Sequence, residues 1–219
     1  MTMFRMVPVI TAAGLAVLLS GCAMRPAPPM VRPAAFIPLG VDAPYLTADI
    51  ISGTRARAAK MRAAKIRPLG PGEAQAYLAA TAAELRRQTA GIGIDVLALP
   101  NGVLIRIPAT LTFNSGSAEI APNIRATLHE LARTLKTQPR TYVDVYAHTD
   151  TTGTPAVNKA LSDRRASAVA AFLASDGVGK ARIASRGFGE TAPIYFPDDT
   201  AMKQAANRRV EIRFVPFTG

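Results

Sequence analysis

Strand and helix patterns alternate from residue 94 to residue 215, and this alternation limits the possible fold more than any other feature of the chain. Apolar runs at 94–99 and 103–107 flank Pro100-Asn101-Gly102, and Asn-Gly between two such runs is a strong β-hairpin signal. Residues 141–147 alternate two unlike sets of side chains, which is the period of a strand with different faces. Further strands are expected over 182–186 and 210–215, with a loop over 187–206 between them.

Two amphipathic helices are predicted between these strands. In residues 121–135 the apolar side chains are spaced by four, three and four positions, which places them on one helical face. A second helix begins after Thr154, a suitable capping residue, with Pro155 at its first position, and it ends at Gly177. From residue 103 the order is β-α-β-α-β-β. This order predicts an α+β sandwich in which helices pack on a mixed sheet and loops at its ends are free for binding.

The N-terminus has the layout of a secretory signal. Arg5 precedes an apolar run over 7–19, which at about 13 residues is shorter than the ~20 needed to span a membrane. The run ends in Leu19-Ser20-Gly21-Cys22, which resembles the lipobox of bacterial lipoproteins, where cleavage before the cysteine accompanies its acylation. We therefore expect a signal peptide over 1–21 and lipidation of Cys22. In the sorting pattern of such lipoproteins, Ala23 rather than an aspartate after the cysteine implies the outer membrane, and we expect the chain to be lipid-anchored there on the periplasmic side.

Composition excludes several kinds of functional site. The chain has one cysteine and two histidines, which excludes an intrachain disulfide, a cysteine-rich zinc site and an all-histidine catalytic metal site. Lysine and arginine number 26 against 15 acidic residues, and the resulting charge of +11 favours polyanions such as acidic lipid or phosphate-bearing wall polymers. Nucleic acid is a poor candidate, because an exported chain does not meet it. We expect no cofactor and no metal.

Residues 22–72 are interpreted as a lipid-anchored tether. The prolines between residues 26 and 44 favour extended polyproline II backbone. Residues 55–67 carry six basic side chains and no acidic one, with alanines at spacings that suit a short basic helix. Two interpretations stay open for this charge: contact with anionic headgroups or wall phosphates, and a solvated linker without a partner.

One more predicted helix precedes the main domain. Residues 73–89 place four apolar or aromatic side chains on or near one face and end with two arginines, where cations suit the helix dipole. Segment 73–100 therefore supplies this helix and the first strand of the hairpin, and 101–219 is expected to form the domain. Binding of an envelope protein to this helix also remains an alternative.

Polar side chains follow the strand over 141–147. His148-Thr149-Asp150 lies at the carboxyl end of this strand, and the next helix carries Arg164 and Arg165. An aspartate and an arginine facing one cleft can bind a zwitterion, because carboxylate pairs with ammonium and planar guanidinium pairs with carboxylate. Taken alone, Asp150 more often caps the following turn than binds a ligand. Arg164 and Arg165 taken alone usually form a solvated charged face. His148 is expected to be structural and His129 to lie on the surface.

Five ordered segments between about Val103 and Val215 resemble the OmpA-like peptidoglycan-binding domain family. They are Phe113-Asn114-Ser115-Gly116-Ser117-Ala118-Glu119, His148-Thr149-Asp150 with Thr152-Gly153, Asn158 with Leu161-Ser162 and Arg164-Arg165-Ala166, Gly187-Phe188-Gly189-Glu190 with Pro193, and Asn207-Arg208-Arg209-Val210-Glu211-Ile212. Together with the lipobox they indicate a small OmpA-family outer-membrane lipoprotein.

The resemblance implies a noncovalent function. It implies binding of peptidoglycan through the meso-diaminopimelate of the stem peptide, so that the outer membrane is tethered to the cell wall. By motif position Asp150 meets the diaminopimelate ammonium and Arg165 its carboxylate. The residues expected to shape the pocket are Thr149, Asn158, Asn207 and Arg208.

The chain departs from the family pattern in two places, and two other functions compete. Ala147 stands where the family usually has glycine, and Asn114-Ser115-Gly116 replaces a more acidic loop. An enzyme acting on peptidoglycan needs a nucleophile with its base, a carboxylate pair or a metal, and His148 with Asp150 supplies two of the three protein ligands that catalytic zinc requires. We therefore expect no catalytic residue. The second competitor is an envelope signalling or assembly lipoprotein whose N-terminal half binds a partner protein.

Overall fold

The computed structural model describes residues 54–70 and 72–219. The expected signal peptide, Cys22 and the proline-rich part of the tether lie outside the described residues. The elements are α2 (Thr54–Ala63), α3 (Glu73–Gln88), β1 (Asp95–Leu99), β2 (Gly102–Pro108), α4 (Ala109–Thr112), α5 (Pro122–Thr137), β3 (Thr141–His148), α6 (Pro155–Ser175), β4 (Ile183–Gly189), α7 (Ala201–Asn207) and β5 (Arg209–Pro216). Within this part of the chain no helix combines the length and apolar character needed to cross a membrane.

The five strands form one mixed sheet in the order β1-β2-β5-β3-β4. β5, the last strand in the chain, pairs antiparallel with β2 on one side and with β3 on the other. β3 and β4 run parallel and are joined by α6, since a parallel pair needs a long crossover connection. The predicted α+β fold and its order of strands and main helices are confirmed, with α4 and α7 as additional short helices.

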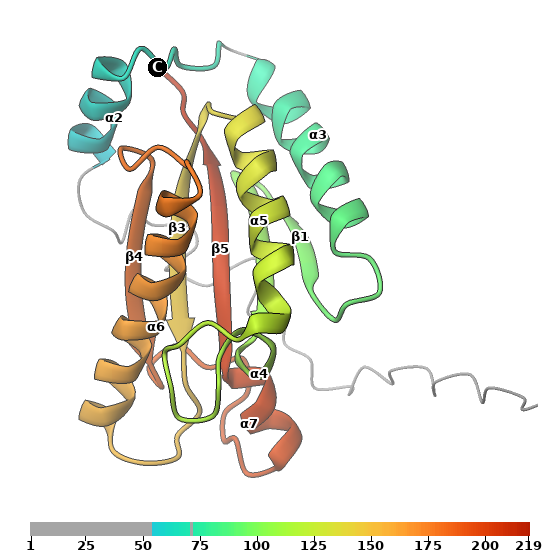
Figure 1. The fold of residues 1–219 in the computed structure, drawn as a ribbon, viewed down its shortest axis with the longest axis vertical. Coiled ribbons are helices and arrows are strands. Elements are labelled where there is room, and N and C mark those ends of the chain that lie inside the picture. The colour runs from blue at the N-terminus through green and yellow to red at the C-terminus, as the bar shows by residue number, and fades with distance from the viewer. Residues whose placement is uncertain (1–53, 71) are drawn as a thin grey trace, which may run out of the picture. The chain divides into compact units, whose positions relative to one another are not determined.

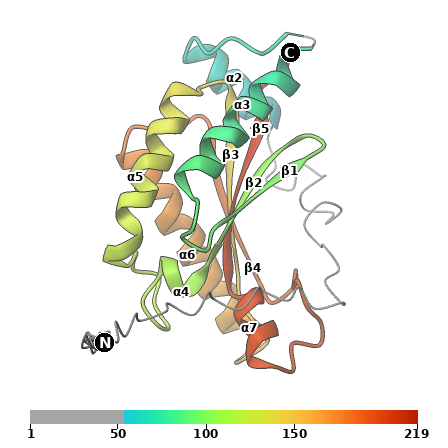
Figure 2. The same ribbon diagram turned by 90° about the vertical axis from the view of Figure 1, so that its right-hand side faces the viewer.

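Helices α3, α5 and α6 cover one face of the sheet, as the edge-on view in Figure 2 shows. The apolar side chains of α5 that the spacing predicted to lie on one face are buried against this side. Val143 and Val145 of β3 belong to the same core, together with Leu78 and Leu85 of α3. The helix expected over 73–89 is therefore confirmed, and it shares its core with the domain that follows.

The opposite face of β3 carries Tyr142, Asp144 and Tyr146, so the two faces differ in chemistry as the alternation predicted. α2 contacts this face where β3 begins. Arg57 of α2 donates from Nη1 to Asp144 Oδ1 at 2.6 Å, and Met61 is fully buried in a cluster with Tyr142. The basic helix predicted within 55–67 thus forms, and it packs on the sheet.

The predicted loop over 187–206 is wrong at both of its ends. β4 continues through Gly189, and α7 forms from residue 201 with Thr200 as its cap, whose hydroxyl accepts from the Lys203 N–H at 3.3 Å. Glycine usually interrupts a strand, but here it is needed for space. A Cβ on Gly187 would lie 2.2 Å from the Asp163 nitrogen of α6, so only glycine lets this strand approach the helix so closely.

Candidate ligand-binding site

The candidate site lies where β3 ends and α6 begins, at the end of the sheet that also carries α4 and α7 (Figure 1). Asp150 follows β3 and is only 6% exposed. Its Oδ1 accepts from the Thr152 N–H at 3.1 Å, which holds the carboxylate in a local turn. Its Oδ2 is paired with Nη1 of Arg208, which precedes β5. Two segments 58 residues apart are therefore joined by one charge pair.

Arg165 reaches the same place from α6, whose start is capped by Thr154 as predicted. Its Nε donates to the Ser117 carbonyl at 2.9 Å, and its guanidinium lies over the Phe113 ring, 5.0 Å from the ring centre. Burial lowers the pKa of the Arg165 guanidinium, the nearby charge of Arg208 lowers it further, and Asp150 opposes both. The three charges therefore act on one another directly.

These two arginines line a pocket with about 510 Å³ of empty space. Its other walls come from α4 and from the loop over 113–116, including the Asn114-Ser115-Gly116 segment that departs from the family pattern. Arg164, the neighbour of Arg165, is exposed and does not line this pocket. Of the two adjacent arginines, only Arg165 lines the pocket. The Asn114-Ser115-Gly116 loop forms part of the pocket wall.

Asn158 holds the two sides of the site together. Its Nδ2 donates to the Asp150 carbonyl at 3.2 Å and to Glu190 Oε2 at 2.6 Å, and the residue is buried. The start of α6 is therefore tied both to the loop after β3 and to the segment after β4. These contacts position Asp150, and they use both amide hydrogens of Asn158.

Asn207 has a similar role beneath Arg208. Its Oδ1 accepts from the Ile194 and Tyr195 N–H groups at 2.7 and 3.0 Å, and its Nδ2 donates to Asp198 at 3.2 Å. Asp198 also accepts from the Thr151 N–H at 2.9 Å. The loop before α7 is thereby connected to the loop that holds Asp150, so both loops are fixed relative to the sheet.

Thr149 and His148 are buried behind the site. The Thr149 N–H donates to the Gly189 carbonyl at 2.9 Å, and its hydroxyl has no hydrogen-bond partner among the described residues. The His148 ring stacks on Phe188 with centres 5.2 Å apart, and its Nε2 lies 3.4 Å from Glu211 Oε2. Burial and the nearby charge of Arg209 lower the pKa of His148 to about 4. The imidazole is therefore neutral at pH 7 and structural, as expected.

A family model for the OmpA family matches residues 112–208, which contain the whole Asp150, Arg165 and Arg208 site. This chain carries an OmpA family domain. It is 38% identical over 141 residues to "Probable lipoprotein YiaD" of Escherichia coli, a match that covers 64% of each protein. It is 36% identical to "Peptidoglycan-binding protein ArfA" of Mycobacterium bovis over 47% of this chain and 31% of the relative. The chain thus spans less than two thirds of either relative.

A solved structure shows the same fold for the OmpA family domain. The crystal structure of a MotB-like protein from Desulfovibrio vulgaris superimposes with a TM-score of 0.59 and 24% identity, and the match covers 66% of this chain and 97% of that one. At this identity the likeness concerns the fold alone.

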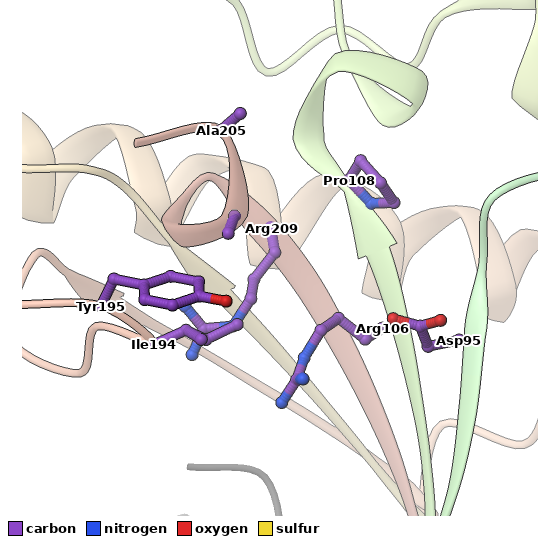
Figure 3. Close-up of a pocket in the computed structure, with 8 residues that line it drawn as sticks. Asp95, Arg106, Pro108, Ile194, Tyr195, Ala205 and Arg209 are labelled. Carbon is purple, nitrogen blue, oxygen red and sulfur yellow. The ribbon is translucent and has the colours of Figure 1, made fainter. Parts of the chain in front are cut away.

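A second pocket lies beside β2 and β5 (Figure 3). Figure 3 shows Tyr195 and Ile194 on one side of it and Asp95 and Pro108 on the other, with Arg106 and Arg209 between them. Both arginines contact Oε1 of the fully buried Glu211, at 3.0 and 2.9 Å. Both guanidinium groups are therefore paired with a carboxylate inside the sheet. In the described part of the chain no group of three His, Cys, Asp or Glu residues is arranged to hold a metal.

The sequence alone did not reveal three contributors to the site. Phe113 supports the Arg165 guanidinium, Ser117 accepts from it, and Asp198 ties the two loops together. The first two belong to a segment that resembled the family, but nothing in that segment shows which partner each one has. Asp198 lies 47 residues from Thr151, so no local pattern identifies the contact.

Proposed function

We propose that this chain binds peptidoglycan noncovalently, with the meso-diaminopimelate end of a stem peptide in the pocket of Arg165, Arg208 and Asp150. The observation that carries the proposal is that two guanidinium groups line one pocket and that one of them, Arg208, is paired with the buried carboxylate of Asp150. With two positive charges and one negative charge, the site favours a ligand that has a carboxylate beside an ammonium group.

Each charged group has the capacity that such a ligand requires. The Asp150 carboxylate accepts one backbone N–H and one guanidinium hydrogen, and a carboxylate offers about four acceptor positions. An ammonium group can therefore join it without displacing Arg208. Arg165 donates from Nε to the Ser117 carbonyl. The two terminal nitrogens of its guanidinium remain for bidentate binding of a carboxylate.

The membrane end of the proposed function rests on the sequence and the relatives. Cys22 after the lipobox is proposed to be acylated, and several acyl chains give stable anchoring where a single one does not. The similar protein from Escherichia coli is named as a lipoprotein, and the one from Mycobacterium bovis as a peptidoglycan-binding protein. Acting as a binding module without catalysis, this chain would tether the outer membrane to the wall from its periplasmic side.

The decisive experiment measures binding to two kinds of wall. The chain from residue 23 onward contains every described core residue, so we use it in place of a shorter fragment. Sacculi containing diaminopimelate should bind it, and walls with lysine at that position should not, because lysine lacks the second carboxylate. Asp150→Ala and Arg165→Ala should each weaken binding by roughly 30-fold to several thousand-fold, since either change leaves one charge of the bound ligand without its proposed partner.

The matched control is Arg164→Ala. It removes the same charge one residue away from Arg165, but from an exposed side chain outside the pocket. Arg165→Lys keeps the charge and loses the planar fork, so it should also bind poorly. Equal binding to both wall types, or equal loss in the Arg164 and Arg165 variants, would mean that a +11 chain adheres by charge alone.

A further inference from the structure

A second charged surface lies at the end of the sheet opposite the pocket. Figure 1 shows α2 and the C-terminus at this end, where β3 begins. The pocket lined by Arg165 and Arg208 lies at the other end, where β3 finishes. Five basic side chains on α2 and just after it are exposed, and residues 55–70 contain no acidic residue. We call them the basic cluster: Arg55, Lys60, Arg62, Lys65 and Arg67.

Two other residues of α2 are buried and attach the helix to the sheet. Arg57 is 8% exposed, and besides its pair with Asp144 it donates from Nη2 to the Arg182 carbonyl at 2.6 Å. Its guanidinium also lies over the Tyr142 ring, 4.6 Å from the centre. Met61 is completely buried. With these two side chains facing inward, the basic cluster lies on the solvent side of this segment.

Among the described residues, no salt bridge joins the basic cluster to an acidic side chain. Asp144, which contacts α2, is paired with the buried Arg57. Glu73, at the start of α3, accepts from the Gly70 N–H at 2.6 Å and lies 3.5 Å from Arg140. That backbone hydrogen bond and the charges of Arg140 and Arg67 lower the pKa of Glu73, so its carboxylate offsets the charge near Arg67 but is paired with Arg140. The basic cluster is therefore a concentrated positive surface.

Lys65 follows α2 in a backbone conformation that is unusual for a residue other than glycine. Its φ is 59°, a left-handed conformation that glycine adopts without steric cost, and the following Ile66 N–H donates to the Met61 carbonyl at 3.0 Å. Glycine is therefore the less strained residue at this position, so the charge of Lys65 can be removed there without distorting the end of α2.

We infer that the basic cluster binds the surface of an anionic phospholipid bilayer. α2 is the first described element after the segment that contains Cys22, so in the lipid-anchored state of the proposed function it is the described element nearest the anchor along the chain. Juxtamembrane lysines and arginines attract anionic lipid at close range. The two binding surfaces lie at opposite ends of β3, about 25 Å apart for its eight residues, so the domain can contact the membrane and the wall together.

The test uses lipid vesicles and the chain from residue 23 onward, without the acyl anchor. It should sediment with phosphatidylcholine vesicles that contain phosphatidylglycerol and stay in solution with phosphatidylcholine alone, and added salt should release it. The variant Arg55→Gln/Lys60→Gln/Lys65→Gly should bind the anionic vesicles roughly 100-fold more weakly. The thermal unfolding temperature of this variant should not be lower than that of the unmodified chain, because Lys65→Gly relieves the strained φ at residue 65.

The matched control removes the same number of charges elsewhere. Arg125→Gln/Arg164→Gln/Lys203→Gln changes positive side chains on α5, α6 and α7, and it should bind anionic vesicles about as well as the unmodified chain. Equal loss in the two triple variants, or no preference of the unmodified chain for phosphatidylglycerol, would overturn the inference. So would loss of binding to sacculi in the α2 variant with vesicle binding intact, which would assign the cluster to wall polymers. Asp150→Ala separates the two proposals, because it should lose sacculi and keep vesicles.

Discussion

Glu211 lies fully buried in β5, between the guanidinium groups of Arg106 and Arg209 and the imidazole of His148. Burial raises the pKa of its carboxyl, but the two arginines and the histidine outweigh burial and hold it well below its usual range. The same burial keeps His148 neutral. This cluster therefore stabilises the sheet only in one protonation state, with Glu211 ionised and His148 uncharged.

At the scale of the single residue, His148 should make stability depend on pH. Its pKa is about 4 in the folded chain and about 6.5 when unfolded, so between these values the unfolded chain binds more protons and stability falls as pH is lowered. From pH 7.5 to pH 5 the loss should be about 2 kcal/mol. Denaturant unfolding of the unmodified chain and of His148→Gln measures it, because the variant lacks this dependence. The same loss in the variant would contradict the assignment.

β4 and α6 approach each other closely. The Gly187 N–H donates to Asp163 Oδ1 at 2.9 Å, and the Gly189 N–H donates to Ser162 Oγ at 2.8 Å. The side chains of α6 thus bond directly to the strand backbone. Because α6 also carries Asn158 and Arg165, this contact sets the position of the ligand pocket relative to the sheet.

Gly187→Ala should therefore destabilise the fold strongly. The new Cβ would lie 2.2 Å from the Asp163 nitrogen and 2.3 Å from Ser162 Oγ, so β4 and α6 must separate. A loss of about 1–3 kcal/mol is typical of overpacking, and ligand binding should weaken as α6 shifts. Gly179→Ala is the control, since its nearest neighbour would be Arg182 Cδ at 3.8 Å. The denaturant midpoints of the two variants measure the difference in stability. Equal stability would contradict the prediction, because it would show that β4 can move away from α6 without cost.

Local spacing predicted the elements that have a long repeating pattern. The apolar positions of α5, the capped start of α6 and the alternation in β3 all lie within one segment each, so the sequence shows them directly. α7 was missed because seven residues are too few for a helical period to stand out. The resemblance placed Asp150 and Arg208 in one pocket but did not predict that they contact each other. Their direct contact depends on how β5 pairs with β3.

Long-range contacts also explain why the basic segment is more than a linker. Arg57 and Asp144 are 87 residues apart, and neither has a neighbour in sequence that predicts the other. A run of arginine, lysine and alanine is typical of a solvated helix, and five of the six basic side chains are indeed exposed. Burial of the sixth attaches the helix to the sheet, which fixes where the exposed charges lie.

At the scale of the whole molecule, the proposed anchor and the proposed wall pocket should fail separately. Cys22→Ser should leave unprocessed precursor and remove the protein from the outer-membrane fraction, because the peptidase that reads a lipobox acts on the lipidated cysteine. Asp150→Ala should be processed normally and stay with the outer membrane, but it should no longer remain on sacculi after detergent extraction. Only a chain with both residues can connect the two layers, because acyl chains hold one end and the charge pocket holds the other. Fractionation of cells that express each variant measures both properties together. Normal processing and membrane retention of Cys22→Ser would reject the anchor, whereas loss of both attachments in Asp150→Ala would mean that the wall pocket and the membrane end are not independent.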